Sequence, residues 1–313
     1  MSDTSPLSPL DEAAYHRLRT QLSGLPDRPP RPMASHHIVL RGMRFHYLEW
    51  GAPDAPPLLF LHGGGQTCHT WELVCDALAD RYRCLALDQR GHGDSEWSYE
   101  SDYSPQAHLG DIAAFIDALG LARPTIVGMS MGALNGLHVA LSRPEAVSAL
   151  VMVDAGPWIS IAGAGPIRDF MRTVSTLDQL DDFVATALRF NPQRDARLLR
   201  RSLLHNLRRR ADGRLMWKTD LRQTTDLAVI ESWMTSLRDR VAALACPLLV
   251  VRGGNSDVLS DGDAERFAAA VPDGRWVRID SAGHAVQGDQ PKALIAALET
   301  FLDTVPQCTP RVS

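Results

Sequence analysis

One serine in this sequence stands in a setting that could make its hydroxyl reactive. The pentapeptide at 128–132 reads GMSMG, and it lies between a short apolar run, residues 124–127, and a helix-like run, residues 133–141. Gly-x-Ser-x-Gly between a strand and a helix predicts a sharp turn that presents the serine at the edge of a sheet. A serine hydroxyl becomes a useful nucleophile when a base lies within hydrogen-bond reach. We therefore expect Ser130 to be a catalytic nucleophile.

Candidates for the base, and for the acid that orients it, follow two later apolar runs. His284 stands on a loop after the expected strand at 275–279, and Asp257 follows the expected strand at 247–254. The carboxyl ends of parallel strands meet at one edge of a sheet, so both side chains could approach Ser130 there. The histidine would take the serine proton, and the aspartate would hold the imidazole in one tautomer. We predict the triad Ser130, Asp257 and His284.

Other residues could fill the same roles. Asp154 ends the apolar run at 149–154 and is the alternative acid; as a structural residue it would brace the start of the segment that follows. His62 and His92 are the alternative bases. Both stand in glycine-rich turns, where a polar side chain usually ties the loop together, so we prefer His284.

Five motifs, taken in order, resemble the α/β-hydrolase family with a helical cap. They fall within residues 36–304, which is nearly the whole chain outside its first 35 residues. The motifs are HGGG at 62–65, DQRGHGDS at 88–95, GMSMG at 128–132, GGNSD at 253–257 and SAGH at 281–284. The resemblance implies a serine, an acid and a histidine in that order along the chain, which supports Asp257. It does not identify a substrate, because this fold hosts many reactions.

Two backbone amides are expected to stabilise the negative charge that forms when the serine attacks a carbonyl. One is the N–H of Met131, at the start of the helix that follows the serine. The second should come from the glycine loop at 62–65, where the family resemblance favours Gly64. A phosphate-binding loop is the alternative for these glycines, but no Lys-Ser or Lys-Thr pair follows them.

The remaining pattern predicts the elements that position these residues. Expected strands lie at 38–40, 45–50, 58–61, 83–88, 124–128, 149–154, 247–254 and 275–279, and expected helices at 71–78, 106–119, 131–142, 263–270 and 291–302. The first two strands form a hairpin, and the later strands alternate with helices. This alternation predicts an α/β fold with a mostly parallel twisted sheet and helices on both of its faces.

The alternation stops in the middle of the chain. Residues 155–241 show helical periodicity without strong strands, with expected helices at 167–174, 177–190, 195–206 and 227–237. We predict an all-helical cap over the edge of the sheet. The domains would then be an N-terminal arm at 1–35, a core at 36–154 and 242–306, and a cap at 155–241. The arm should be partly helical and lie on the core or on a partner subunit.

The sequence offers several candidates for a substrate pocket. Aromatic residues of the cap could line it, and plain packing within the cap is the alternative that we favour for each. The pocket candidates are Gly65, Trp158, Phe190, Trp217, Trp233 and Val258, with Met131 beneath them.

Composition excludes several classes of function. The chain has 313 residues, a net charge of −5 and 45% hydrophobic residues, which is ordinary for a soluble protein and disfavours nucleic acid or an anionic membrane as partner. Its five cysteines are far apart and form no CxxC pair, which argues against a disulfide framework or a zinc site and favours the cytoplasm. No apolar run reaches the roughly 18 residues of a membrane span. A homodimer is compatible with the sequence.

These residues suggest a cofactor-independent serine hydrolase of a small carboxylic ester, thioester or lactone. A serine at this position argues against the epoxide hydrolases and haloalkane dehalogenases that share the fold, because they need an aspartate there. Cleavage of a carbon–carbon bond in a dienoic keto acid is the alternative, since the triple glycine is similar to ring-fission-product hydrolases. Those usually have Gly-Pro after the HG motif, whereas Gln66 and Thr67 follow here. A hydrolase-like receptor or scaffold without turnover is the third hypothesis.

Overall fold

A computed structural model describes residues 12–159, 176–190, 195–223 and 227–306. Its centre is an eight-stranded sheet. The strands are β1 (Met33–Leu40), β2 (Met43–Trp50), β3 (Pro57–Leu61), β4 (Arg83–Leu87), β5 (Thr125–Met129), β6 (Ala149–Val153), β10 (Leu248–Gly253) and β11 (Gly274–Ile279). Their order across the sheet is β1-β2-β4-β3-β5-β6-β10-β11.

Most of this sheet is parallel, as the sequence predicts. Strands β4, β3, β5, β6, β10 and β11 pair in parallel, whereas β2 pairs antiparallel with both β1 and β4. Every residue of β3, β5 and β6 is buried, because helices cover both faces of the sheet and leave no side for water. The parallel strands therefore end together at one edge, where loops can meet.

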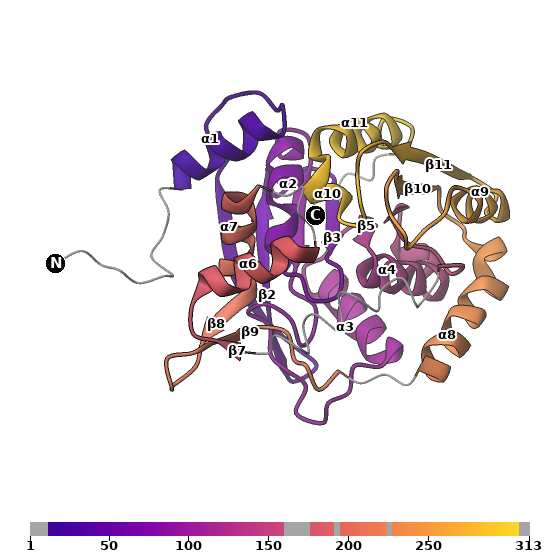
Figure 1. The fold of residues 1–313 in the computed structure, drawn as a ribbon. Helices are drawn as coiled ribbons and strands as arrows, with labels where there is room; N and C mark the ends of the chain where they lie inside the picture. The colour runs from indigo at the N-terminus through magenta and orange to yellow at the C-terminus, as the bar shows by residue number, and fades with distance from the viewer. Residues whose placement is uncertain (1–11, 160–175, 191–194, 224–226, 307–313) are drawn as a thin grey trace.

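Two groups of helices cover the sheet (Figure 1). The helices are α2 (Glu72–Leu78), α3 (Pro105–Ala118), α4 (Met131–Ser142), α8 (Leu227–Arg240), α9 (Asp261–Ala270), α10 (Val286–Asp289) and α11 (Pro291–Leu302). One apolar core joins the sheet to α3, α4, α8 and α9, and the other joins it to α2, α10 and α11. Among the described helices, none has the length and apolar character that crossing a bilayer requires.

The segment between β6 and β10 differs from the all-helical insertion that the sequence predicts. It contains α6 (Leu180–Phe190), α7 (Ala196–Asn206) and α8, and also a small antiparallel sheet of β7 (Thr176–Leu177), β9 (Leu215–Trp217) and β8 (Leu207–Arg209). The expected helix at 167–174 lies outside the described residues.

The physical reason for the extra sheet is a hairpin that the helical pattern conceals. Asp212 and Gly213 form a tight turn in which Gly213 has φ +85°, and Arg210 and Arg214 are hydrogen-bonded across it. In β9, the buried Leu215 and Trp217 alternate with the less buried Met216, and they pack on α6 and α7 in a separate apolar core. Asp-Gly beside alternating apolar residues is a hairpin signal.

The N-terminal arm lies on the core and on the inserted segment. Its helix α1 (Glu12–Leu22) places Arg19 in an ion pair with Glu72, at the start of α2. The guanidinium of Arg201, on α7, stacks on the ring of Tyr15 at 5.2 Å from its centroid. The arm therefore contacts α2 and α7 together.

Candidate active site

The turn that carries Ser130 has a backbone conformation that only close packing can enforce. Ser130 lies between β5 and α4 with φ +52° and ψ −117°, a sparsely populated region for a residue with a side chain. A Cβ on Gly128 would come within 2.5 Å of the backbone of α4, and one on Gly132 would come within 2.3 Å of the Leu61 carbonyl oxygen. Both glycines are thus required, and Ser130 is left half-buried at the end of β5.

The imidazole of His284 is held by a buried carboxylate. Its Nδ1 lies 2.7 Å from Oδ2 of Asp154, whose side chain is fully buried at the end of β6. A carboxylate only accepts hydrogen bonds, so Nδ1 carries a proton, and in the neutral ring the lone pair is then on Nε2. His284 itself is partly exposed. This tautomer is the one that a histidine base needs.

The expectation that Asp257 pairs with His284 is wrong in this structure. Asp257 is exposed, and the carboxylate that faces His284 is the alternative one, Asp154. The reason is the path of the loop after β10, which wraps around the Asp154 carboxylate and turns Asp257 toward solvent. Both aspartates follow a strand, so the sequence pattern does not distinguish them; only the loop path does.

Two further donors, one at the end of β10 and one in the loop that follows it, satisfy the Asp154 carboxylate. The N–H of Gly253 donates to Oδ1 at 2.9 Å, and the Ser256 hydroxyl donates to Oδ2. Ser256 is buried, and its Oγ accepts in turn from the N–H of Val258 at 3.1 Å. A buried carboxylate without such donors would be costly, because it has lost its water. Ser256 escaped the sequence analysis, since nothing distinguishes it from an ordinary loop serine.

Backbone hydrogen bonds between adjacent chain segments bring the nucleophile and the acid together. The N–H of Ser130 donates to the carbonyl of Val153 at 3.2 Å, one residue before Asp154. The N–H of Asp154 donates in turn to the carbonyl of Val251 on β10, at 2.7 Å. Ser130, Asp154 and the loop that holds Asp154 therefore lie at one edge of the sheet, and the hydrogen bond from His284 brings the imidazole to the same edge.

The glycine loop after β3 lies directly beside the nucleophile. A Cβ on Gly63 would come within 3.3 Å of the Ser130 Cβ. The N–H of Gly63 is already used, since it donates to Oε1 of Gln66 at 3.1 Å. Gly64 is exposed and open space surrounds the position of a Cβ there. Met131, the other residue expected to stabilise an anion, lies in the first turn of α4, directly after Ser130.

The alternative bases hold loops together. Nδ1 of His62 donates to the carbonyl of Gly63 at 2.8 Å, and its Nε2 accepts from the N–H of Gln89 at 3.0 Å. His92 donates from Nδ1 to the carbonyl of Arg90 at 3.0 Å. Burial lowers the pKa of both, to about 3 for His92, so both rings are neutral structural groups.

Most of the predicted pocket residues pack within the protein. Trp158 contacts the ring of Phe267 at a centroid distance of 5.7 Å, and Trp217 lies edge-on to Phe183 at 5.2 Å. Val258 is buried. The carbonyl of Gly65 accepts from the Asn206 side chain at 3.5 Å, and the Phe190 side chain lies outside the described residues.

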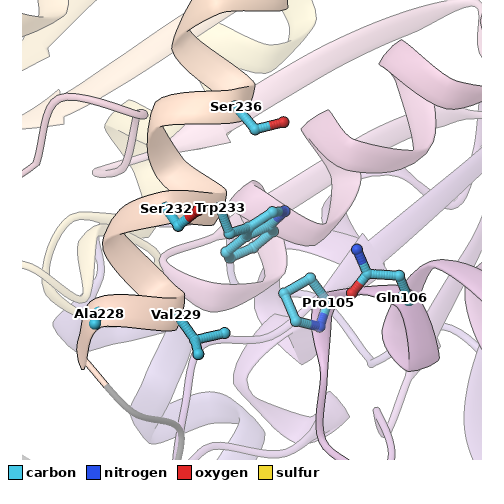
Figure 2. A pocket seen from close by; sticks show the side chains of 7 residues that line it. All are labelled: Pro105, Gln106, Ala228, Val229, Ser232, Trp233 and Ser236. Atoms are coloured by element: carbon cyan, nitrogen blue, oxygen red, sulfur yellow. The ribbon is translucent and has the colours of Figure 1, made fainter.

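Trp233 lines a cavity that is separate from the triad. Figure 2 shows its indole on α8 facing Pro105 and Gln106, at the start of α3. These residues line a cavity of about 430 Å³. None of Ser130, Asp154 and His284 lines this cavity. Trp233 also contacts His138 edge-on, at a centroid distance of 5.9 Å. It is therefore a packing residue between α8 and the core.

Comparison with known proteins places this arrangement in context. Residues 56–291 match the model of the alpha/beta hydrolase fold family. The chain is 36% identical over 269 residues to the esterase Rv0045c of Mycobacterium tuberculosis, covering 82% of this chain and 86% of that protein. A solved structure of that esterase, described together with its inhibition by transition metals, superposes with a TM-score of 0.77 at 31% identity, covering 95% of this chain and 100% of that one.

Two other relatives carry different activities in their names. The sn-1-specific diacylglycerol lipase ABHD11 of Mus musculus is 28% identical over 285 residues, covering 87% of this chain and 89% of that protein. The 2-(acetamidomethylene)succinate hydrolase of Mesorhizobium japonicum is 28% identical over 284 residues, covering 87% and 98%. All three relatives are named for hydrolytic activities, and their substrates differ.

Proposed function

Because the chain belongs to the α/β-hydrolase fold family, we propose that it is a serine hydrolase that cleaves a small carboxylic ester through an acyl-enzyme on Ser130. The observation that carries the proposal is the hydrogen bond between His284 and the buried Asp154 at the sheet edge where Ser130 stands. The esterase named among the relatives supports ester cleavage over the other reactions of the family.

The reaction follows from the roles that these groups can take. Nε2 of His284 accepts the Ser130 proton as Oγ attacks the ester carbonyl. The amides of Met131 and Gly64 stabilise the oxyanion, and one such donor contributes about 3–4 kcal/mol in a serine protease. The imidazolium, stabilised by Asp154, returns the proton to the leaving alcohol. Water then enters, again activated by His284, and releases the carboxylic acid from Ser130.

We further propose that residues 155–241 form a cap that shapes the substrate site. The end of α7 supports this assignment, because Asn206 bonds the Gly65 carbonyl at 3.5 Å and the Thr67 hydroxyl at 3.4 Å. The inserted segment thus contacts the loop that is proposed to hold the oxyanion. The N-terminal arm at 1–35 and the core at 36–154 and 242–306 complete the proposed domains.

Cytoplasmic function and a homodimer complete the proposal. Cys68, Cys75, Cys84 and Cys246 are buried free thiols, a state that a reducing compartment maintains. Light scattering on the purified protein would determine the number of subunits.

The test uses short p-nitrophenyl esters and a fluorophosphonate. We expect the protein to hydrolyse the esters and to be labelled on Ser130, and we expect Ser130→Ala to remain folded and lose both properties. Ser202→Ala, a change at an exposed serine on α7, is the matched control and should keep both. Labelling or ester turnover that survives in Ser130→Ala contradicts the proposal. Turnover of a dienoic keto acid without any ester hydrolysis would favour carbon–carbon cleavage by the same triad.

A further inference from the structure

A second cluster of reactive side chains lies outside the triad. It consists of His69, in the short helix Cys68–Trp71, Glu72, at the start of α2, and His205, near the end of α7. One potential ligand atom from each residue lies within 4.8 Å of the other two. Two of these residues belong to the core and one to the inserted segment, so the cluster joins the two parts.

The carboxylate of Glu72 lies at the centre of the cluster. Its Oε2 pairs with the Arg19 guanidinium, which leaves Oε1 for the histidines. Nδ1 of His69 lies 2.5 Å from Oε1, and Nε2 of His205 lies 3.8 Å from the same atom. One oxygen thus faces two imidazole nitrogens.

His205 has an unused nitrogen in this place. Its Nε2 is buried and makes no hydrogen bond within the described part of the chain. Buried polar atoms normally have a partner, so an unused one indicates a missing ligand or a functional role.

We propose that His69, Glu72 and His205 bind a transition-metal ion such as Zn²⁺ or Cu²⁺. Two imidazoles and a carboxylate are ligands that these ions accept, at about 2.0–2.2 Å. The ion takes the place of the proton between His69 Nδ1 and Glu72 Oε1, and that proton moves to Nε2 of the same ring. No electron transfer is involved.

Two features of the cluster predict that binding is weaker than at a structural zinc centre. The His69 and His205 rings stack at 3.5 Å between centroids with 16° between their planes, so at least one ring must turn before both lone pairs meet. The guanidinium of Arg19 opposes a cation near Glu72, and the positive charge of Arg201 lies near His205. We expect dissociation constants in the micromolar range.

The position of the ion has a consequence for turnover, which rests on the proposed ester hydrolysis. The ion would link α7 to the loop that leads from Gly65 to His69. Asn206, the residue after His205, already bonds Gly65 and Thr67 in that loop. A bound ion would therefore fix α7 on the proposed oxyanion loop, and we expect it to slow ester hydrolysis.

The test measures binding directly, by calorimetric titration of the purified full chain with Zn²⁺ and by the visible absorption of added Co²⁺. We expect one ion per chain, and at least tenfold weaker binding in His69→Ala and in His205→Ala. His37→Ala, at an exposed histidine of β1, is the matched control and should bind like the unaltered protein. Tetrahedral Co²⁺ absorption should disappear in the first two variants and remain in the control.

A fourth variant separates this site from the triad. His284→Ala should abolish ester hydrolysis and leave Zn²⁺ affinity unchanged. If His284→Ala loses the ion, or if His69→Ala and His205→Ala bind it as tightly as the control, the proposal is overturned. Because binding is measured without substrate, this result stands whether or not the protein is an esterase.

Discussion

The imidazole of His284 reaches across β10 to the carboxylate of Asp154. His284 follows the edge strand β11, whereas Asp154 ends β6, two strands further into the sheet. Gly253, the last residue of β10, and Ser256, in the loop after it, each donate a hydrogen bond to the same carboxylate. The acid therefore has a rigid, buried setting, and the histidine is the more exposed member of the pair.

Asp154→Asn should abolish most of the activity, whereas Asp257→Asn should not. An asparagine at 154 can present its amide to His284 and favour the wrong tautomer, which costs about 10⁴-fold in turnover in a serine protease. Asp257 is exposed, so its replacement should change turnover by less than twofold. Steady-state ester hydrolysis by the two variants measures the difference. If Asp154→Asn kept its turnover and Asp257→Asn lost it, Asp257 would be the acid of the triad after all.

Ser256→Ala should lower the rate of ester hydrolysis. Ser256 and His284 donate to the same oxygen of Asp154, so removing the hydroxyl leaves the buried carboxylate that orients His284 with one donor fewer. We expect turnover to fall roughly two- to tenfold, since one hydrogen bond contributes about 0.5–1.5 kcal/mol net. Steady-state ester hydrolysis measures the loss.

Ser256→Thr keeps a hydroxyl at this position and is the control for Ser256→Ala. Its turnover should be close to that of the unaltered protein. Unchanged turnover in Ser256→Ala, with a lower unfolding temperature, would mean that Ser256 supports only the fold of the loop.

Gly132→Ala should destabilise the protein strongly, and Gly64→Ala should not. A methyl group on Gly132 would meet the Leu61 carbonyl oxygen at 2.3 Å and the His62 carbonyl oxygen at 2.6 Å, and these are backbone atoms that cannot easily move aside. We expect a loss of about 3 kcal/mol or more in the free energy of unfolding. Open space surrounds the same position on Gly64. Urea unfolding of both variants tests the contrast, and equal stability would show that the turn can relax.

Thermal stability should fall in acid because three histidines, two of them buried and one partly buried, resist protonation. Burial lowers the pKa of His92 and His108 to about 3 and that of His205 to about 2. Their pKa in the unfolded chain is about 6.5, so below that pH the unfolded state binds protons that the folded state refuses. Each histidine then costs about 1.4 kcal/mol of stability per pH unit, until the pH reaches its folded pKa.

Calorimetric unfolding from pH 8 to pH 4 would measure this effect. The unfolding temperature should be nearly constant above pH 7 and fall steadily below pH 6.5. His108→Leu removes one of the three groups and should make the fall less steep. A flat profile between pH 7 and pH 5 would show that these rings accept protons in the folded protein.

The sequence predicts the sheet better than the site. Each strand of the sheet and the sharp turn at Ser130 leave a local trace, either an apolar run or fixed glycines, and these predictions agree with the observed elements. The choice between Asp154 and Asp257 leaves no local trace in the sequence, because both residues follow strands and the path of a loop decides between them. Ser256 was missed because its partner, Asp154, is distant in the sequence. The β8–β9 hairpin was missed because β8 directly follows α7 and resembles the end of that helix.

The contact of Arg19 with Glu72 also matters for how this protein is handled. A version shortened to begin at β1 would remove the guanidinium and leave the carboxylate of Glu72, on the first turn of α2, without its strongest counter-charge. Loss of one partner of such a pair commonly costs about 3–5 kcal/mol. Expression vectors should therefore encode α1, because a shorter catalytic fragment that lacks this helix is expected to be less stable.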